Sequence, residues 1–181
     1  EAIERYERAM DLLKRLSGTT THQALLAVNL ANTELSRGRL PETRVRLERL
    51  DALVKQAELE DREAGVTAHM IWAAYLRRAD DLDAALSHAR TALSGSEALF
   101  GETHFRTADA LSILAHVEAD LGQLDEARIH AERARAFDTT VASDRAQTAF
   151  ALARVLWASD ADRERAIALA REAHADLSRA P

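Results

Sequence analysis

Histidines and carboxylates are the residues of this chain that could do chemistry, as metal ligands or as acids and bases. The histidines stand at positions 22, 69, 88, 104, 116, 130 and 174. No two of them show the i, i+4 spacing with an intervening glutamate that a helical zinc site uses. We interpret His104 as a linker residue that caps or packs between units, and the others as surface or interface residues. The sequence therefore predicts no metal site.

Two carboxylate pairs, Asp80/Asp81 and Asp125/Glu126, could serve acid–base catalysis. Both pairs lie at the starts of predicted helices, where negative charge complements the helix dipole, so a structural role explains them. The chain contains no G-x-S-x-G motif, no glycine-rich phosphate loop, no kinase catalytic sequence and no cysteine. We predict no catalytic residue, no cofactor and no enzymatic activity for this chain.

The composition predicts an all-α fold. Of the 181 residues 38 are alanine and 47% are hydrophobic, whereas aromatic residues make up only 4%. Alanine is the best helix former, and strand-forming β-branched and aromatic residues are scarce. Six glycines and two prolines leave little material for the many turns of an all-β protein.

The charge distribution argues against a nucleic-acid partner. The formal net charge is −6, and neither half of the chain is basic. The densest arginine cluster is interleaved with acids, which predicts a solvated helix face with local ion pairs. The cluster consists of Arg37, Arg39, Arg44, Arg46 and Arg49, with Glu34, Glu42, Glu48 and Asp51 between and around them.

Targeting signals are not recognisable in the sequence. The apolar runs are too short and too often broken by charges to span a membrane, and the N-terminus shows no signal-peptide pattern. We therefore predict a cytoplasmic protein without a membrane partner. The chain starts without Met on a helix-like stretch, EAIERYERAM, which suggests a piece of a longer protein. The 22 arginines against 2 lysines suggest a GC-rich bacterial genome.

A pattern of small residues repeats along the chain. Its anchors are Ala2, Thr43, Ala85, Ala127 and Ala166, at intervals of 41, 42, 42 and 39 residues. A near-constant step of this size is typical of a solenoid. Positions +4 and +7 share one helical face with each anchor. They are occupied by Tyr6/Ala9, Leu47/Leu50, Ala89/Ala92, Ala131/Ala134 and Ala170/Ala173.

Each repeat is predicted to be a pair of antiparallel helices. A second small residue lies 12 or 13 positions before an anchor, at Ala31, Ala73, Ala115 and Ala153. First helices are predicted at about 23–37, 66–79, 106–121 and 144–158, and second helices at about 1–15, 41–61, 82–97, 125–137 and 163–178. We predict one array over 1–181: a truncated repeat (1–15), then repeats at 23–61, 66–97, 106–137 and 144–178.

Turn residues support these boundaries. Gly38 and Gly122 suit the left-handed conformation that ends a helix, and Pro41 suits a first helical position. Asp81, Thr103 and Ser143 are predicted N-caps. Trp72 is predicted to lie in the core between the two helices of its own unit. Phe150 and Trp157 either cover the end of the array or contribute to binding.

The small-residue pattern, together with LFGETHFRTADALSILAHVEADLGQLDEARIHAERA over 99–134, resembles the tetratricopeptide repeat in its longer, kinesin-light-chain-like form. The linker residues Gly101 and His104, followed by Thr107 and Ala108, look like those of that form, although Phe105 stands where a proline is common. The segment AFALARVLWASDADRERAIALAREAHADL is similar to the last repeats of myxobacterial serine/threonine kinases. The resemblance implies a right-handed α-solenoid.

The resemblance also implies a function, namely a non-catalytic scaffold that binds a peptide or protein segment on a concave face lined by the first helices. By position, this groove would contain Asn29, Asn32, Met70, Arg77, Ser112, His116, Phe150 and Arg154. Its mixed character suggests a partner that is both acidic and apolar. Two alternatives stay open: a substrate-recruiting region of a bacterial serine/threonine kinase or other signalling protein, and a peptide-pheromone or small-ligand sensor. A homo-oligomer is also possible, because the ends of an array expose faces that neighbouring repeats would cover.

Overall fold

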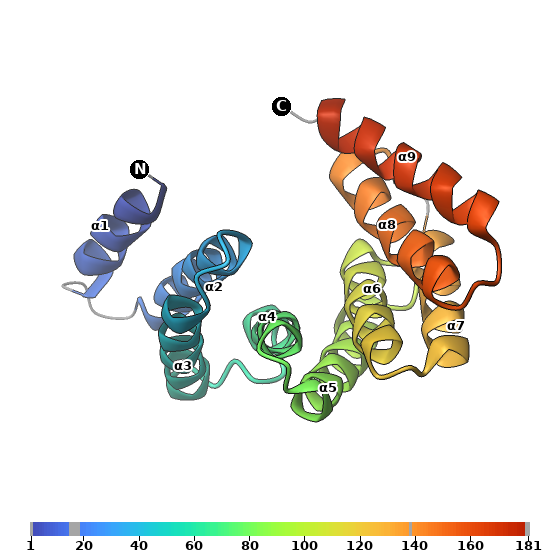
Figure 1. Ribbon diagram of the computed structural model, residues 1–181. Coiled ribbons are helices and arrows are strands. Elements are labelled where there is room, and N and C mark those ends of the chain that lie inside the picture. The colour runs from blue at the N-terminus through green and yellow to red at the C-terminus, as the bar shows by residue number, and fades with distance from the viewer. Residues whose placement is uncertain (1, 15–18, 138, 180–181) are drawn as a thin grey trace. The chain divides into compact units, whose positions relative to one another are not determined.

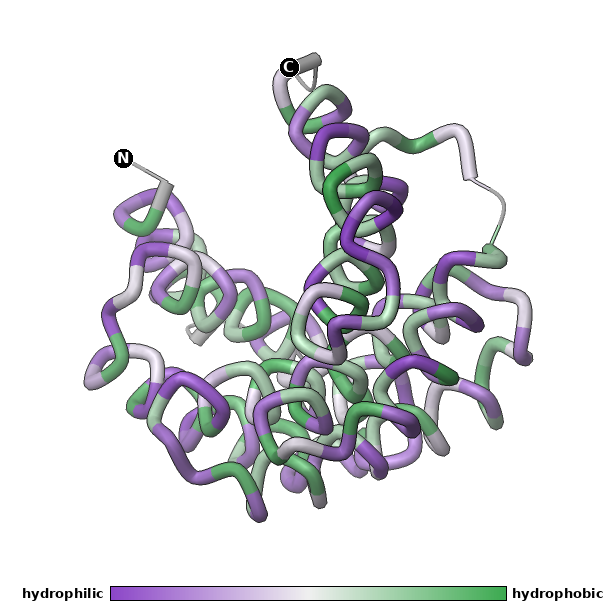
Figure 2. Tube along the Cα trace, turned by 45° about the vertical axis from the view of Figure 1, so that its right-hand side comes forward, coloured by the Kyte–Doolittle hydropathy of each residue, from purple (hydrophilic) through white to green (hydrophobic). Residues whose placement is uncertain are grey.

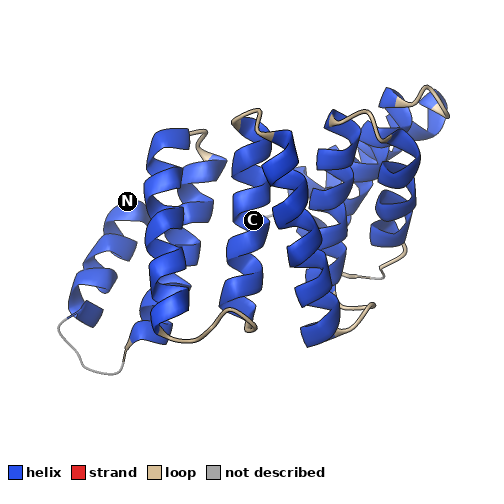
Figure 3. Cartoon of the chain, turned by 90° about the horizontal axis from the view of Figure 1, so that it is seen from below, coloured by secondary structure: helices blue, strands red, loops and turns tan. Residues whose placement is uncertain are grey.

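The computed structural model describes residues 2–14, 19–137 and 139–179. Within these ranges the chain forms helices and turns and contains no β-strand (Figure 3). The helices in chain order are α1 (Ala2–Lys14), α2 (Thr20–Ser36), α3 (Leu40–Gln56), α4 (Glu63–Arg78), α5 (Leu82–Phe100), α6 (Phe105–Asp120), α7 (Leu124–Arg135), α8 (Ala142–Ala158) and α9 (Arg163–Arg179). The predicted all-α class is therefore confirmed.

Most predicted helix boundaries agree with the structure to within three residues. The main difference is α3, which was expected to reach residue 61 but ends at Gln56. Glu58 adopts a positive φ of 53°, and the Leu59 amide donates to the Val54 carbonyl at 2.9 Å, so the chain turns away there. Of the predicted first helix, 1–15, the terminal residues 1 and 15 lie outside the described ranges.

The helices group into two compact units, Glu1–Asp81 and Leu82–Pro181, which divide the predicted second repeat between α4 and α5. In the first unit, α2 packs against α1, α3 and α4 (Figure 1). In the second unit, α6 packs against α5, α7 and α8, and α8 also packs against α7 and α9. Apolar side chains line these contacts, while hydrophilic stretches alternate with them along each helix (Figure 2).

One turn geometry recurs at the end of every first helix. Gly38, Asp80, Gly122 and Asp160 have positive φ angles of 72°, 64°, 77° and 53°. In each case the next amide donates to the carbonyl five residues back: Arg39 to Glu34, Asp81 to Leu76, Gln123 to Glu118, and Ala161 to Leu156. This is the Schellman arrangement, which satisfies a terminal carbonyl and reverses the chain. The expectations for Gly38 and Gly122 are confirmed, whereas Pro41 lies at the second position of α3, one residue after the first position expected for it.

The repeated small residues form the contact faces of the second helices, and we call them the alanine seam. Its members in α5 and α7 are fully buried: Ala85, Ala89, Ala92, Ala127, Ala131 and Ala134. The seam continues in α3 as Thr43, Leu47 and Leu50, also fully buried. In α9, Ala166 and Ala173 are buried but Ala170 is exposed, because α9 packs only against α8 among the described helices. The side chain of Ala2 lies outside the described residues.

The histidines are used as packing and capping residues where the structure shows their contacts. His104 is the N-cap of α6: its Nδ1 accepts from the Arg106 amide at 3.2 Å, and its ring stacks on Phe100 at a centroid distance of 4.9 Å. His130 of α7 lies 2.7 Å from the buried Glu118 carboxylate of α6. The linker and interface roles expected for these two residues are confirmed.

Two of the predicted N-caps are displaced. Thr103 lies one residue before the cap that His104 provides, and Ser143 lies inside α8, which begins at Ala142. Asp81 directly precedes α5, as expected. A side chain caps a helix only when the backbone bends at its own position, and residue type alone does not fix that position.

Trp72 packs toward the preceding helix instead of sitting between the two helices of its own unit. Its indole N–H donates to the Asp51 carboxylate of α3, at 2.9 Å to Oδ2, and its ring meets Tyr75 edge-on. The side chain is half-buried against the core of the first unit. A partly buried indole N–H usually has an acceptor, and Asp51 of α3 supplies it here.

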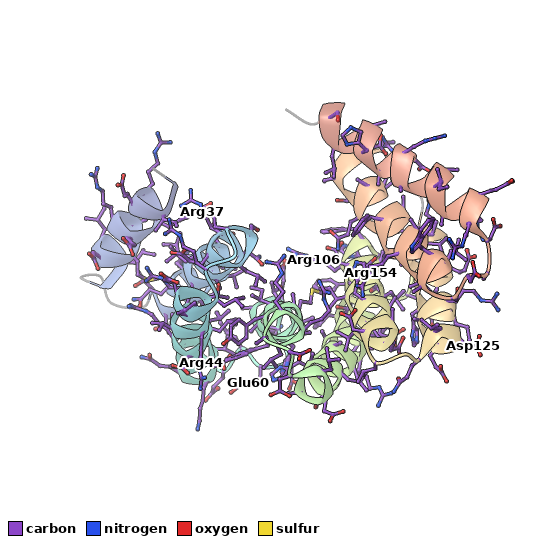
Figure 4. All side chains as sticks on the ribbon, viewed as in Figure 1. Arg37, Arg44, Glu60, Arg106, Asp125 and Arg154 are labelled. Atoms are coloured by element: carbon purple, nitrogen blue, oxygen red, sulfur yellow. The ribbon has the colours of Figure 1, made fainter. Side chains whose placement is uncertain are left out.

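The arginine cluster forms ion pairs, as predicted, but its members do not share one face, because Arg44 and Arg46 lie on opposite sides of α3. Arg44 pairs with Glu48 one turn later at 3.0 Å, Arg46 pairs with Glu7 of α1, and Arg39 lies 3.6 Å from Glu34. Figure 4 labels Arg37 and Arg44, both of which are exposed.

Candidate functional site

The residues predicted to line a groove are divided between the units. In the first unit, Asn29 and Asn32 are exposed on α2, and Arg77 is half-buried on α4. Met70 is only 5% exposed, so it offers no surface to a partner. The residues of this group that a partner could contact, Asn29, Asn32 and Arg77, are therefore polar.

In the second unit, Ser112 is fully buried on α6, and its hydroxyl donates to the Ala108 carbonyl one turn earlier at 2.9 Å. A serine that bonds back to its own helix takes no part in outside contacts. The sequence predicted that Met70 and Ser112 line the groove. In the structure both side chains are buried in the packing between helices.

The other three predicted residues meet across the two first helices of the second unit. The rings of His116 on α6 and Phe150 on α8 have a centroid distance of 5.9 Å. Arg154 of α8 donates to Nδ1 of His116 at 3.0 Å and also to the carboxylate of Asp120. We call His116, Asp120, Phe150 and Arg154 the α6–α8 ladder; Figure 4 labels Arg154 within it.

The ladder has a regular register. His116 meets Phe150, and Asp120 meets Arg154, so each contact joins residues 34 apart. Because both partners advance by four residues, α6 and α8 run parallel and side by side. Their exposed side chains therefore form one continuous strip on the second unit. Phe150 is 53% exposed, which makes it the largest apolar group the ladder offers to solvent.

The same strip carries an acidic end that sequence reasoning missed. Asp109 precedes His116 by two helical turns and so lies on the same face of α6. Burial, and after it the negative charge of Asp144 on α8, raise the pKa of Asp109 to about 6, and Arg106 opposes this with a smaller effect. The i, i+7 relation between Asp109 and His116 was the available sequence signal. Figure 4 labels Arg106 on the same helix.

Comparisons with known proteins place these helices in a family. The family model described as tetratricopeptide repeat matches residues 65–140, which run from α4 to just beyond α7. This stretch of the chain is similar to tetratricopeptide repeats. A comparison with curated proteins finds no match.

Solved structures extend the likeness in fold over almost the whole chain. The crystal structure of BtubC (BKLC) from P. vanneervenii has a TM-score of 0.76 at 20% identity, and the match covers 96% of this chain and 70% of that one. A putative kinesin light chain from P. anserina with nearly identical TPR-like repeats gives 0.67 at 17% identity, covering 98% and 86%. The fold is thus a TPR-like solenoid, as predicted. The kinase and ligand-sensor alternatives stay predictions.

In tetratricopeptide-repeat terms, the α6–α8 ladder joins the first helices of two successive repeats. Trp157 lies two turns beyond Phe150 on α8 and is 52% exposed, but the guanidinium of Arg163 covers its ring at 4.8 Å from the centroid. This cation–π contact uses one face of the indole within the chain. Phe150 carries no such cover from a cation among the interactions of the described residues.

Two other kinds of site were searched for in the described ranges. No group of three or more His, Asp or Glu side chains there could hold a metal ion. None of the helices in those ranges is both long enough and apolar enough to cross a membrane.

Proposed function

We propose that this chain is a non-catalytic scaffold that binds a peptide or protein segment along the first helices of its repeats, on the concave side. The α6–α8 ladder of the second unit is the principal contact. The observation that carries the proposal is the half-exposed Phe150 ring, held against His116 and next to the Arg154–Asp120 pair.

The chemistry of the ladder suits recognition. An aromatic ring provides a large apolar contact area with few rotatable bonds, and the Phe150 ring also contacts His116 on the neighbouring helix. The ion pair beside it can exchange hydrogen bonds with a peptide backbone. A solenoid spreads such groups along an axis, which suits an elongated partner better than a compact small molecule.

The test is a selection of short random peptides displayed on phage against the immobilised chain, followed by affinity measurements with labelled synthetic peptides. We expect Phe150→Ala to weaken the selected peptides by about tenfold, as for the aromatic anchor of an interface. The matched control is Ile129→Ala, because Ile129 is also exposed (63%) but lies on the second helix α7. Peptides that depend on Ile129 and not on Phe150 would move the binding surface elsewhere.

A further inference from the structure

Asp120 differs from the residues at its position in the other repeats. It is the last residue of α6, two residues before the positive-φ turn. The first helices α2, α4 and α8 hold Ser36, Arg78 and Ala158 at that position. A negative charge at the C-terminal end of a helix is unfavourable, because the helix dipole is negative there too. The repeat architecture therefore does not require this acid, and its own helix disfavours it.

The neighbouring helix α8 supplies the charge that balances Asp120. The guanidinium of Arg154 pairs with the Asp120 carboxylate through Nη2, and both side chains are 28% exposed. Its other terminal nitrogen, Nη1, donates to Nδ1 of His116 at 3.0 Å. A guanidinium has no acceptor, so Nδ1 of His116 must accept, which requires the neutral imidazole. Two side chains of α6 thus hold Arg154, and one of them cancels its charge.

The α6–α8 ladder therefore carries no net charge around the Phe150 ring. Arg154 follows Phe150 by one helical turn, so the two side chains are neighbours on one face of α8. With Asp120 in place, a charged group of a partner beside Phe150 would lose hydration without gaining a net attraction. Asp109 lies two turns from His116 along α6, about 10 Å, a distance at which salt screens much of its charge.

We propose that Asp120 sets the charge specificity of the α6–α8 ladder. By neutralising Arg154, it directs the ladder to a peptide segment that places a large apolar side chain on Phe150 and has uncharged residues on both sides of it. This inference rests on the proposed function and names the class of partner more closely. The partner differs from the acidic and apolar segment that the sequence suggests. Loss of the Asp120 charge converts the ladder into a site for such an acidic segment.

The peptides selected for the proposed function provide the probe. One peptide that requires Phe150 is synthesised in three versions, with asparagine, aspartate or lysine on both sides of its large apolar residue. We expect the wild type to bind the asparagine version at least as tightly as the other two. Asp120→Asn should bind the aspartate version about three- to fivefold more tightly than the asparagine version, in the range of a partly exposed ion pair. This gain should disappear at about 1 M salt, where charges are screened beyond about 3 Å.

Two further variants separate the local charge from other effects. Glu132→Gln also removes a carboxylate from an arginine, Arg165, but between the second helices α7 and α9, so it should leave the order of the three peptides unchanged. Asp120→Asn/Arg154→Gln removes both charges of the ladder and should abolish the preference for the aspartate version. Circular dichroism of each variant shows that the helices are intact.

The outcomes separate the two proposals. This inference is overturned by a wild type that prefers the aspartate or lysine version, or by an Asp120→Asn variant that keeps the wild-type order. It is equally overturned if Glu132→Gln changes the order in the same way, or if the double variant still prefers aspartate. In all these cases the dependence on Phe150 leaves the proposed function in place. If no selected peptide requires Phe150, both proposals fail.

Discussion

Replacing Asp109 by asparagine should stabilise this protein at neutral pH. Burial and the charge of Asp144 raise the pKa of Asp109 from 3.8 to about 6 in the folded chain. A difference of this size between folded and unfolded states corresponds to about 3 kcal/mol. The carboxyl keeps part of its surface in solvent, which screens its charge, so we expect a gain of ~1–2 kcal/mol for Asp109→Asn.

The pH dependence has a definite sign. The folded-state pKa of Asp109 is raised, so its ionised form destabilises the folded chain at every pH above about 6. As the pH falls from 6 towards 3.8, the folded protein takes up the proton first and the penalty disappears. The advantage of Asp109→Asn over the wild type should therefore be full at pH 7, about two thirds smaller near pH 4.5, and absent below 3.8.

Urea unfolding followed by circular dichroism at the two pH values measures this difference. Taking the difference between variant and wild type removes the titration of the other carboxylates, which is common to both. The control Glu126→Gln changes an exposed acid on α7 and should alter stability by no more than about 0.5 kcal/mol at either pH. A variant that is no more stable than the wild type at pH 7, or equally stabilised at both pH values, would refute the reasoning.

Three further predictions concern stability and can be read from the same urea curves. Ala131→Leu should lower the free energy of unfolding by ~1–3 kcal/mol because Ala131 is fully buried in the alanine seam. Ala170→Leu, at the equivalent but exposed position of α9, should change it by under ~0.5 kcal/mol. Equal effects of the two substitutions would show that the seam is not closely packed. Gly65→Ala should lower the free energy of unfolding by more than ~2 kcal/mol, because a Cβ there would lie 2.2 Å from the Glu60 carbonyl oxygen. Gly122→Ala should lower it by less, because the space there is open and only the φ of 77° opposes alanine. His104→Ala should cost ~1 kcal/mol through the lost N-cap of α6, and His104→Asn should recover most of it; no difference between these two variants would show that the cap is not what matters.

The parts of the fold that the sequence predicted are those that depend on residues close together along the chain. Helix periodicity identified the seam, because residues three and four apart share a face wherever a helix forms. The glycines at positions 38 and 122 marked the ends of first helices, because a left-handed residue costs least when it is glycine. The other two turns use Asp80 and Asp160, which tolerate the same conformation but are too common elsewhere to predict it.

The candidate site was predicted less completely, for reasons that lie in the packing between helices. A helical wheel places Met70 and Ser112 near the edge of the inner face, but the lateral position of the neighbouring helix decides whether an edge residue is exposed. Both are buried. His116, Phe150 and Arg154 contact one another, and these contacts depend on the register between α6 and α8, which no local pattern contains.

The charge of the strip shows most clearly what a list of residue types omits. The sequence suggested that Arg154 would meet an acidic partner, but an arginine side chain is long enough to reach several acids, and Arg154 pairs with Asp120 on the preceding first helix, α6. Asp109 and Asp144 are separated by 35 positions in the sequence, yet the charge of Asp144 raises the pKa of Asp109. The charge next to Phe150 is therefore set by an ion pair between two first helices, which a list of residue types does not reveal.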